Sequence, residues 1–316
     1  MTQAETTPTP EHRYHKHPWR RRIEQHLVYW ATFLATWGLV RLPLRWVQRL
    51  GNGVGWIVFT CFPKRRRLAD GNVEKCFPGR FTAEERRAIV LGCCRNVSKT
   101  MLELLKMPRM KHEDVRAMVD FDGLERFDAA YKLGKGVIVV TAHYGNWELG
   151  ASTLSLLGYK MHVVARDASG AQTADIINRS REAMGIEVLG REGTLAMVKA
   201  LRRGGAIGIL PDQHQVGGAV LTFLGRPAAT AIGPAMLALR SGATIIPVFV
   251  RRIEGDRFLY LIHEPVEMPA TEDRQEAAVA LAQKLNDIIS AEVMAHPEQW
   301  LWLHDRWKAE RQAAQA

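Results

Sequence analysis

The chain has 316 residues, and 47% of them are apolar, which is enough for a packed core and excludes a globally disordered protein. Lys and Arg number 43 against 33 Asp and Glu, a net charge of +10, so we expect an anionic partner such as nucleic acid, anionic lipid or an acidic carrier protein. Cys61, Cys76, Cys93 and Cys94 have neither CxxC nor zinc-site spacing, which favours reduced packing thiols.

The first 67 residues contain two apolar stretches beside basic clusters. Residues 1–18 are polar, without a signal peptide, and are predicted to be a disordered tail. The uncharged run 27–40 follows Arg20–Arg22, and the apolar run 54–62 precedes Lys64–Arg67. Trp-rich apolar segments with basic ends favour a membrane anchor facing anionic lipid. Residues 19–67 are therefore predicted to anchor the chain. A true span, which needs about 20 apolar residues, and a buried hairpin with solvated ends both stay open.

The rest of the chain, residues 68–316, is predicted to be one catalytic domain. Thr82 is expected to cap a helix that runs to Met107, and 114–119 and 123–133 are expected to be short connectors or helices. From Lys135 onward strands and helices alternate. Strands are predicted at 136–141, 160–165, 185–189, 206–210, 244–251 and 257–263, and helices at 146–157, 175–184, 194–203, 230–240 and 273–295. This alternation predicts an α/β layer with functional groups at the strand ends.

The first polar cluster follows the strand 136–141. His143 comes just after that strand, and Glu148 lies in the first turn of the next helix. Across such a turn a carboxylate can fold back to hold an imidazole while the other ring nitrogen takes a proton from a hydroxyl. Gly145 permits the tight turn, and Asn146 is a candidate helix cap. The alternative is a purely structural pair, with His143 capping the helix and Glu148 balancing its dipole.

Two other strand ends carry polar groups. Arg166 follows the strand 160–165, where it could stabilise an oxyanion, or pair with Asp167 in a structural role. Asp212, Gln213 and His214 follow the strand 206–210 and Pro211. His214 is a competing base, ranked below His143 because the only carboxylate near it in the sequence motif is Asp212.

Five motifs together resemble a known family. They are HYGNWE at 143–148, the strand-end Arg166, LPDQ at 210–213, the stretch 233–250 and the closing segment 296–307. In this order they resemble the late acyltransferases of lipid A biosynthesis, the lauroyl/myristoyl transferases of the lysophospholipid acyltransferase superfamily, from about Trp19 to Lys308. The resemblance implies a mixed, largely parallel central sheet flanked by helices, like that of glycerol-phosphate acyltransferase, with an N-terminal membrane-anchoring helical segment.

The resemblance also implies catalytic roles. His143 would deprotonate an acceptor hydroxyl that attacks an acyl thioester, with Glu148 as its orienter. Arg166 would stabilise the oxyanion, and Asp212 would hold the site geometry or Arg166. The residues predicted to contact substrate are Asn146, Trp147, Gln213 and Arg306. The segment that contains Arg306 is expected mainly to close the site.

The implied reaction moves a fatty acyl chain from acyl carrier protein to a hydroxyl of a lipid A precursor, on the cytoplasmic face of the bacterial inner membrane. No metal ion is expected, and the acyl thioester is a co-substrate rather than a cofactor. HYGNWE also resembles acyltransferases of other glycolipids, including mannosylated phosphatidylinositol. Acyl-CoA as donor, and another glycolipid or a lysophospholipid as acceptor, therefore stay open.

Three further inferences concern partners and intermediates. Arg202-Arg203, Arg240 and Arg251-Arg252 are candidate contacts for an acidic carrier protein, with an ordinary solvated face as the alternative. No Ser or Cys stands beside His143, and a Gly-x-Ser-x-Gly elbow is absent from the sequence, so we expect no acyl-enzyme. The basic clusters flank apolar segments and carry no nucleic-acid motif, so no nucleic-acid partner is expected.

Overall fold

The computed structural model describes residues 38–164, 171–190, 193–254 and 257–313. Within these ranges seven strands form one sheet in the order β1-β9-β8-β2-β5-β3-β4. Their bounds are β1 Val119–Asp122, β2 Val137–Val140, β3 Met161–Val164, β4 Glu187–Leu189, β5 Ala206–Ile209, β8 Thr244–Arg252 and β9 Phe258–Ile262. Strands β8, β2, β5, β3 and β4 are parallel, β9 is antiparallel to β8, and β1 is parallel to β9. The predicted mixed, largely parallel sheet is therefore confirmed.

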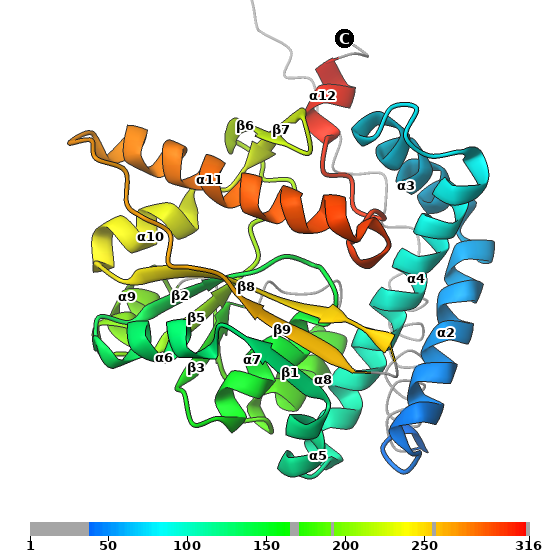
Figure 1. The fold of residues 1–316 in the computed structure, drawn as a ribbon, viewed down its shortest axis with the longest axis horizontal. Helices are drawn as coiled ribbons and strands as arrows, with labels where there is room; N and C mark the ends of the chain where they lie inside the picture. The colour runs from blue at the N-terminus through cyan, green and yellow to red at the C-terminus, as the bar shows by residue number, and fades with distance from the viewer. Residues whose placement is uncertain (1–37, 165–170, 191–192, 255–256, 314–316) are drawn as a thin grey trace, which may run out of the picture.

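Helices cover both faces of this sheet (Figure 1). On one face lie α9 (Thr194–Arg202), α10 (Gly233–Ser241) and α11 (Arg274–Ala295). On the other lie α5 (His112–Ala117), α6 (Leu124–Lys132), α7 (Trp147–Leu156) and α8 (Ala171–Glu182). Strand β2 shows why both faces are covered. Ile138 and Val140 belong to the core beneath α11, whereas Val137 and Val139 belong to the core beneath α7. A central parallel strand buried on both faces is expected to be apolar throughout.

Three helices stand beside the sheet on the right of Figure 1: α2 (Leu44–Cys61), α3 (Pro63–Cys76) and α4 (Ala83–Lys106). The predicted cap is confirmed, because Thr82 Oγ1 accepts from the Glu85 backbone N–H and the Glu85 carboxylate accepts from the Thr82 N–H. Helix α2 packs closely on α4. A Cβ added at Gly55 would lie 2.5 Å from the Arg95 Cα, so only glycine permits this approach. The short 3₁₀ turn η2 (Met107–Arg109) ends α4.

Three strands were missed by the sequence patterns. Strand β1 begins at Val119, the last residue of the first predicted connector, and no element was predicted at 120–122. The hairpin of β6 (Ala219–Phe223) and β7 (Arg226–Thr230) packs beside α11 and turns through Leu224 and Gly225, whose φ angles are 49° and 73°. Two central residues with positive φ are typical of a two-residue hairpin. The helix predicted at 230–240 begins later, at Gly233, because Thr230 still belongs to the hairpin.

The C-terminal segment returns to the edge of the sheet at which β2 ends. It contains η4 (Pro297–Gln299) and α12 (Lys308–Ala313). Between them the Leu301 N–H donates to the His143 carbonyl oxygen over 3.1 Å, and Trp300 forms a β-bridge with Tyr144. The segment is thus held directly against the strand end that carries His143.

The predicted N-terminal anchor falls only in part within the described residues. Residues 1–37, and with them most of the apolar run 27–40, lie outside them. Lys64–Arg67 belong to the first turns of α3, and the predicted boundary after Arg67 lies inside that helix. Among the helices of residues 38–164, 171–190, 193–254 and 257–313, none is long and apolar enough to cross a membrane.

Candidate active site

The core of the site is a hydrogen-bonded pair of His143 and Asp212. The two residues follow β2 and β5, which are neighbouring parallel strands, so their loops leave the same edge of the sheet. His143 Nδ1 lies 2.8 Å from Asp212 Oδ1. The second oxygen, Oδ2, accepts from the His143 backbone N–H and from Trp300 Nε1, each over 2.9 Å. Three hydrogen bonds therefore fix the Asp212 carboxylate against the ring.

The charge of Asp212 sets the tautomer of His143. Burial alone would raise the pKa of this carboxyl, but the nearby His143 and the hydrogen bonds from His143 and Trp300 outweigh burial and hold the pKa below its usual range. The ionised carboxylate can only accept, so Nδ1 carries the hydrogen and Nε2 has the free lone pair. An imidazole held in this tautomer is suited to take a proton from a hydroxyl group.

Glu148 has a different partner from the one predicted. The prediction that its carboxylate orients His143 is wrong in this structure, because Nδ1 of the His143 ring is hydrogen-bonded to Asp212. Glu148 instead accepts two hydrogen bonds from Arg181 of α8, Nη2 to Oε1 at 2.6 Å and Nε to Oε2 at 3.0 Å. A bidentate guanidinium pair is stronger than a single bond to a neutral ring. Trp147 Nε1 donates to Oε1 over 3.1 Å, so the pair is built into the wall beside His143.

A cavity of about 920 Å³ opens at this site. Polar and aromatic groups in its lining include those of His143, Trp147, Glu148, Arg181, Gln213 and Arg240. The remaining lining is mostly apolar and comes from both faces of the sheet. The α7 face supplies Val139, Gly150, Val248, Val250 and Tyr260, and the α10 face supplies Met197, Ile232, Met236 and Leu237. A large apolar cavity with a few convergent polar groups is the usual form of a small-molecule site.

Two of the predicted substrate contacts line this cavity. The Trp147 ring lies 5.3 Å from the His143 ring, centroid to centroid. Gln213 Nε2 lies 3.3 Å from His143 Nε2, so the Gln213 amide can donate a hydrogen bond to the lone pair of that nitrogen. Asn146 does not line the cavity. Its side chain is buried, where Oδ1 accepts from the Leu149 N–H as a helix cap and Nδ2 donates to Glu103.

Arg306 cannot contact substrate in this structure. It is 0% exposed, and its guanidinium donates to the carbonyl oxygens of Gln213 and Ala229 and to Thr230 Oγ1. Burial lowers its pKa to about 10, so it stays charged at neutral pH. The predicted substrate contact is therefore wrong. Arg306 instead ties the hairpin and the Gln213 loop to the closing segment.

His214, the competing base, is held differently from His143. Its backbone N–H donates to His304 Nε2 over 3.0 Å, and its Nδ1 is buried without a hydrogen-bond partner within the described residues. Burial lowers the pKa of His214, and a nearby Arg306 lowers it further. The neighbouring carboxylate, Asp212, is bonded to His143. Of these two candidate bases, His143 is thus the one that a carboxylate orients.

His304 gives a pH-dependent prediction for stability. Burial, reinforced by the nearby His143 and Arg306, lowers its pKa to about 4, whereas an unfolded His titrates near about 6.5. Between these two pH values His304 is therefore protonated in the unfolded chain and neutral in the folded chain. The contribution of His304 to the free energy of unfolding is expected to fall by up to about 3 kcal/mol as the pH drops from about 6.5 to about 4, and this contribution does not change further below that. Urea unfolding of wild type and His304→Gln at several pH values measures this, with a shallower dependence expected for the variant.

Sequence reasoning did not predict the roles of two residues of the site, Arg181 and Trp300. Arg181 was missed because nothing in the helix around it marks a partner 33 positions away. Trp300 lies within the recognised closing segment, yet its bond to Asp212 depends on the chain returning to the ends of β2 and β5. Arg166, the predicted oxyanion group, lies outside the described residues.

Comparison with known proteins identifies the family. A family model described as bacterial lipid A biosynthesis acyltransferase matches residues 15–309. The chain is similar to the lipid A biosynthesis palmitoleoyltransferase of Escherichia coli (strain K12), at 29% identity over 90% of this chain and 92% of that protein. It is similar at 29% identity to the lipid A biosynthesis lauroyltransferase of the same organism, over 90% and 93%. A phosphatidylinositol mannoside acyltransferase of Mycobacterium tuberculosis (strain CDC 1551 / Oshkosh) is 26% identical over 66% of each chain. With a match over nearly its whole length, this chain belongs to the bacterial lipid A biosynthesis acyltransferase family and is an acyltransferase.

Proposed function

We propose that this enzyme transfers a fatty acyl chain from acyl carrier protein to a hydroxyl of a lipid A precursor, with His143 as general base and Asp212 as its orienter. One observation carries the proposal: the oriented imidazole of His143 lines a large, mainly apolar cavity. The cavity can bury an acyl chain, and the imidazole can activate a hydroxyl at its polar end. The two Escherichia coli relatives, a lauroyltransferase and a palmitoleoyltransferase, support a fatty acyl chain as the transferred group.

The proposed reaction has two steps. His143 Nε2 takes the hydroxyl proton while the hydroxyl oxygen attacks the thioester carbonyl, so that a C–O bond forms and a tetrahedral oxyanion appears. The oxyanion then collapses, the C–S bond breaks, and the His143 imidazolium returns its proton to the leaving thiolate. Asp212 stabilises the imidazolium between the steps. Arg166 is the proposed oxyanion group. The mechanism uses no metal ion and no cofactor beyond the thioester co-substrate.

The donor and the acceptor are tested by one panel assay. Purified enzyme is incubated with acyl carrier protein or CoA thioesters, and with either a lipid A precursor or a phosphatidylinositol mannoside, and the products are read by mass spectrometry. We expect transfer from acyl carrier protein to the lipid A precursor, and none by a folded His143→Ala variant. The similarity to the mycobacterial mannoside acyltransferase makes that acceptor the competing outcome. Transfer to the mannoside alone would overturn the proposed substrate, and full activity of His143→Ala would overturn the mechanism.

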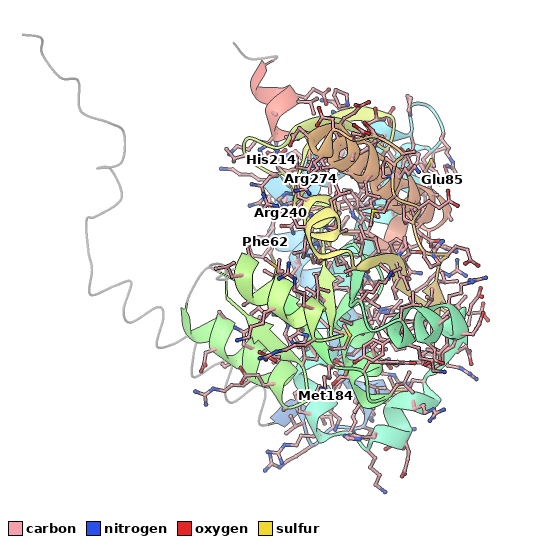
Figure 2. All side chains as sticks on the ribbon, turned by 90° about the vertical axis from the view of Figure 1, so that its left-hand side faces the viewer. Phe62, Glu85, Met184, His214, Arg240 and Arg274 are labelled. Atoms are coloured by element: carbon pink, nitrogen blue, oxygen red, sulfur yellow. The ribbon has the colours of Figure 1, made fainter. Side chains whose placement is uncertain are left out.

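We further propose that the α2 surface docks on the anionic cytoplasmic face of the inner membrane. Apolar side chains between 39% and 55% exposed line this surface: Leu42, Trp46, Leu50, Trp56, Ile57 and Phe62. Exposed arginines stand among them, and Arg49 lies over the Trp46 ring. Amphipathic helices with this composition bind anionic bilayers. Phe62 joins α2 to α3 on the right of Figure 1, so it lies on the far side of the molecule in Figure 2, which is viewed from the left of Figure 1.

Replacing Trp46 and Trp56 with Ser is expected to weaken vesicle binding by roughly 30-fold or more, because each tryptophan then no longer buries apolar surface in the bilayer. Cosedimentation with vesicles containing anionic phospholipid measures the change. Leu133→Ser is the matched control, since Leu133 is 63% exposed at the end of α6. Equal binding by the double variant and by wild type would contradict docking through α2.

A further inference from the structure

The turn that carries His143 is held by hydrogen bonds from several distant segments. The Gly145 N–H donates to the Gln299 carbonyl oxygen over 3.0 Å, and the Asn146 N–H donates to the Val250 carbonyl oxygen over 2.8 Å. The Gly145 carbonyl oxygen accepts from Asn96 Nδ2 and Thr100 Oγ1, at 2.9 Å and 3.0 Å. Two residues of α4 therefore reach across to the peptide that lies two positions after the proposed base.

Gly145 itself leaves this turn no room to shift. Its φ is +55°, and a Cβ added there would lie 1.8 Å from the Val250 carbonyl oxygen. The backbone of the turn is thus pressed against β8 in a conformation that favours glycine. Its position depends on how β8 and α4 are held relative to each other.

A buried ion pair joins α4 to the end of β8. Arg252 Nη1 donates to Glu103 Oε1 over 2.8 Å and Nη2 donates to Oε2 over 2.6 Å. Arg252 also bonds Asn96 Oδ1 at 2.7 Å and Thr100 Oγ1 at 3.0 Å. The Glu103 side chain is 3% exposed and that of Arg252 is 11% exposed. The pair therefore organises both α4 residues that bond the Gly145 carbonyl oxygen.

Glu103 also reaches the turn directly. Its Oε2 accepts from Asn146 Nδ2 over 2.7 Å. Asn146 caps α7 with its other side-chain atom, so Glu103 sets the orientation of the amide that begins the helix. Gln48 of α2 completes the set by donating to Oε1 over 3.1 Å. With four donors on two oxygens, this carboxylate has little freedom to move.

We propose that Glu103 and Arg252 are positioning residues for acyl transfer, which hold the 143–146 turn so that His143 meets both Asp212 and the acceptor hydroxyl. Neither residue lines the cavity. The inference rests on the proposed role of His143 as the base. Apolar side chains could fill the same space, yet they would supply none of the hydrogen bonds that fix the Gly145 carbonyl oxygen and the Asn146 amide. Displacing a catalytic group by about 1 Å can cost about 10²-fold in rate.

Two variants test the proposal. Glu103→Gln keeps the side-chain shape but turns one acceptor oxygen into a donor that faces the donors of Arg252 or Asn146. Asn146→Ser keeps a helix cap and removes only the Nδ2 bond to Glu103. For both we expect kcat per folded enzyme to fall about 10- to 100-fold, with KM for donor and acceptor changed by less than about twofold. The matched control is Glu310→Gln, which weakens an ion pair of Arg226 and Glu310 that joins β7 to α12.

A spectroscopic readout separates positioning from general destabilisation. The ¹⁵N shifts of the His143 ring, assigned by their loss in His143→Gln, report which nitrogen carries the hydrogen. In Glu103→Gln and Asn146→Ser we expect the Nδ1–H form to lose population at a pH where wild type and Glu310→Gln keep it. Unchanged kcat in the folded variants would overturn the proposal, and so would a loss of activity that only follows the folded fraction. If His143→Ala is fully active the proposed function fails, whereas inactive His143→Ala with unaffected Glu103→Gln refutes this inference alone.

Discussion

Asp212→Asn is expected to lower kcat for acyl transfer by about 10²- to 10⁴-fold while the protein stays folded. The amide can still accept from the His143 N–H and from Trp300 Nε1, so the loop geometry survives. It cannot stabilise an imidazolium, and if its NH₂ group faces the ring it favours the wrong tautomer. Steady-state kinetics with the donor and acceptor found in the panel assay measure the loss, and near-ultraviolet circular dichroism checks the fold.

Glu148→Gln is the informative comparison, because it tests the orienter suggested by the sequence motif. Glu148 bonds Arg181 and Trp147 rather than the imidazole, so its replacement is expected to disturb the cavity wall and to raise KM more than it lowers kcat. Asp212→Asn should show the opposite pattern. Near-normal kcat in Asp212→Asn together with a large kcat loss in Glu148→Gln would show that Glu148, and not Asp212, orients the His143 imidazole.

The sequence predicted which strand ends carry the chemistry but not which groups meet there. His143 and Asp212 were both identified, because polar residues directly after apolar strands stand out in the pattern. Their pairing depends on β2 and β5 being neighbours in the sheet, and strand order is not contained in local periodicity. Glu148 was assigned to the imidazole because it was the nearest carboxylate along the chain. Arg181, from a separate helix, outcompetes that contact with two hydrogen bonds.

The fold shows the same division between local and non-local information. The capped α4 and the amphipathic α11 were placed within one or two residues, since caps and periodicity are local signals. Strand β1 and the β6–β7 hairpin were missed. β1 has four residues with alternating acidic side chains and is stabilised by parallel pairing to β9, a strand more than 130 positions later. β7 contains Pro227, a residue that usually argues against a strand.

Selectivity for acyl chain length is expected to change strongly when Gly150 is replaced. Gly150 lies within α7, where glycine costs about 1 kcal/mol relative to alanine, so its presence suggests that the space is needed. It lines the cavity, and a Cβ there would lie 3.3 Å from Val250 Cγ2 and 4.0 Å from Tyr260 Oη. A larger side chain would therefore occupy the part of the cavity between α7 and the sheet.

For Gly150→Leu we expect the preferred acyl chain to shorten by about three carbons. Each methylene that can no longer be buried forfeits about 0.8 kcal/mol, roughly fourfold in affinity. The original chain should then lose roughly 50-fold in kcat/KM while shorter donors keep theirs. Competition between acyl donors of graded length, read by mass spectrometry, measures the shift. Gly150→Ala, which adds one methyl group, should shift the profile only slightly.

Met236→Trp decides which face of the sheet the acyl chain occupies. Met236 lines the same cavity from α10, on the face opposite Gly150. If the chain lies between α7 and the sheet, Met236→Trp should leave the length profile unchanged. An unchanged profile in Gly150→Leu with a shortened one in Met236→Trp would place the chain beneath α10, and the acceptor lipid would then approach His143 from the α7 side.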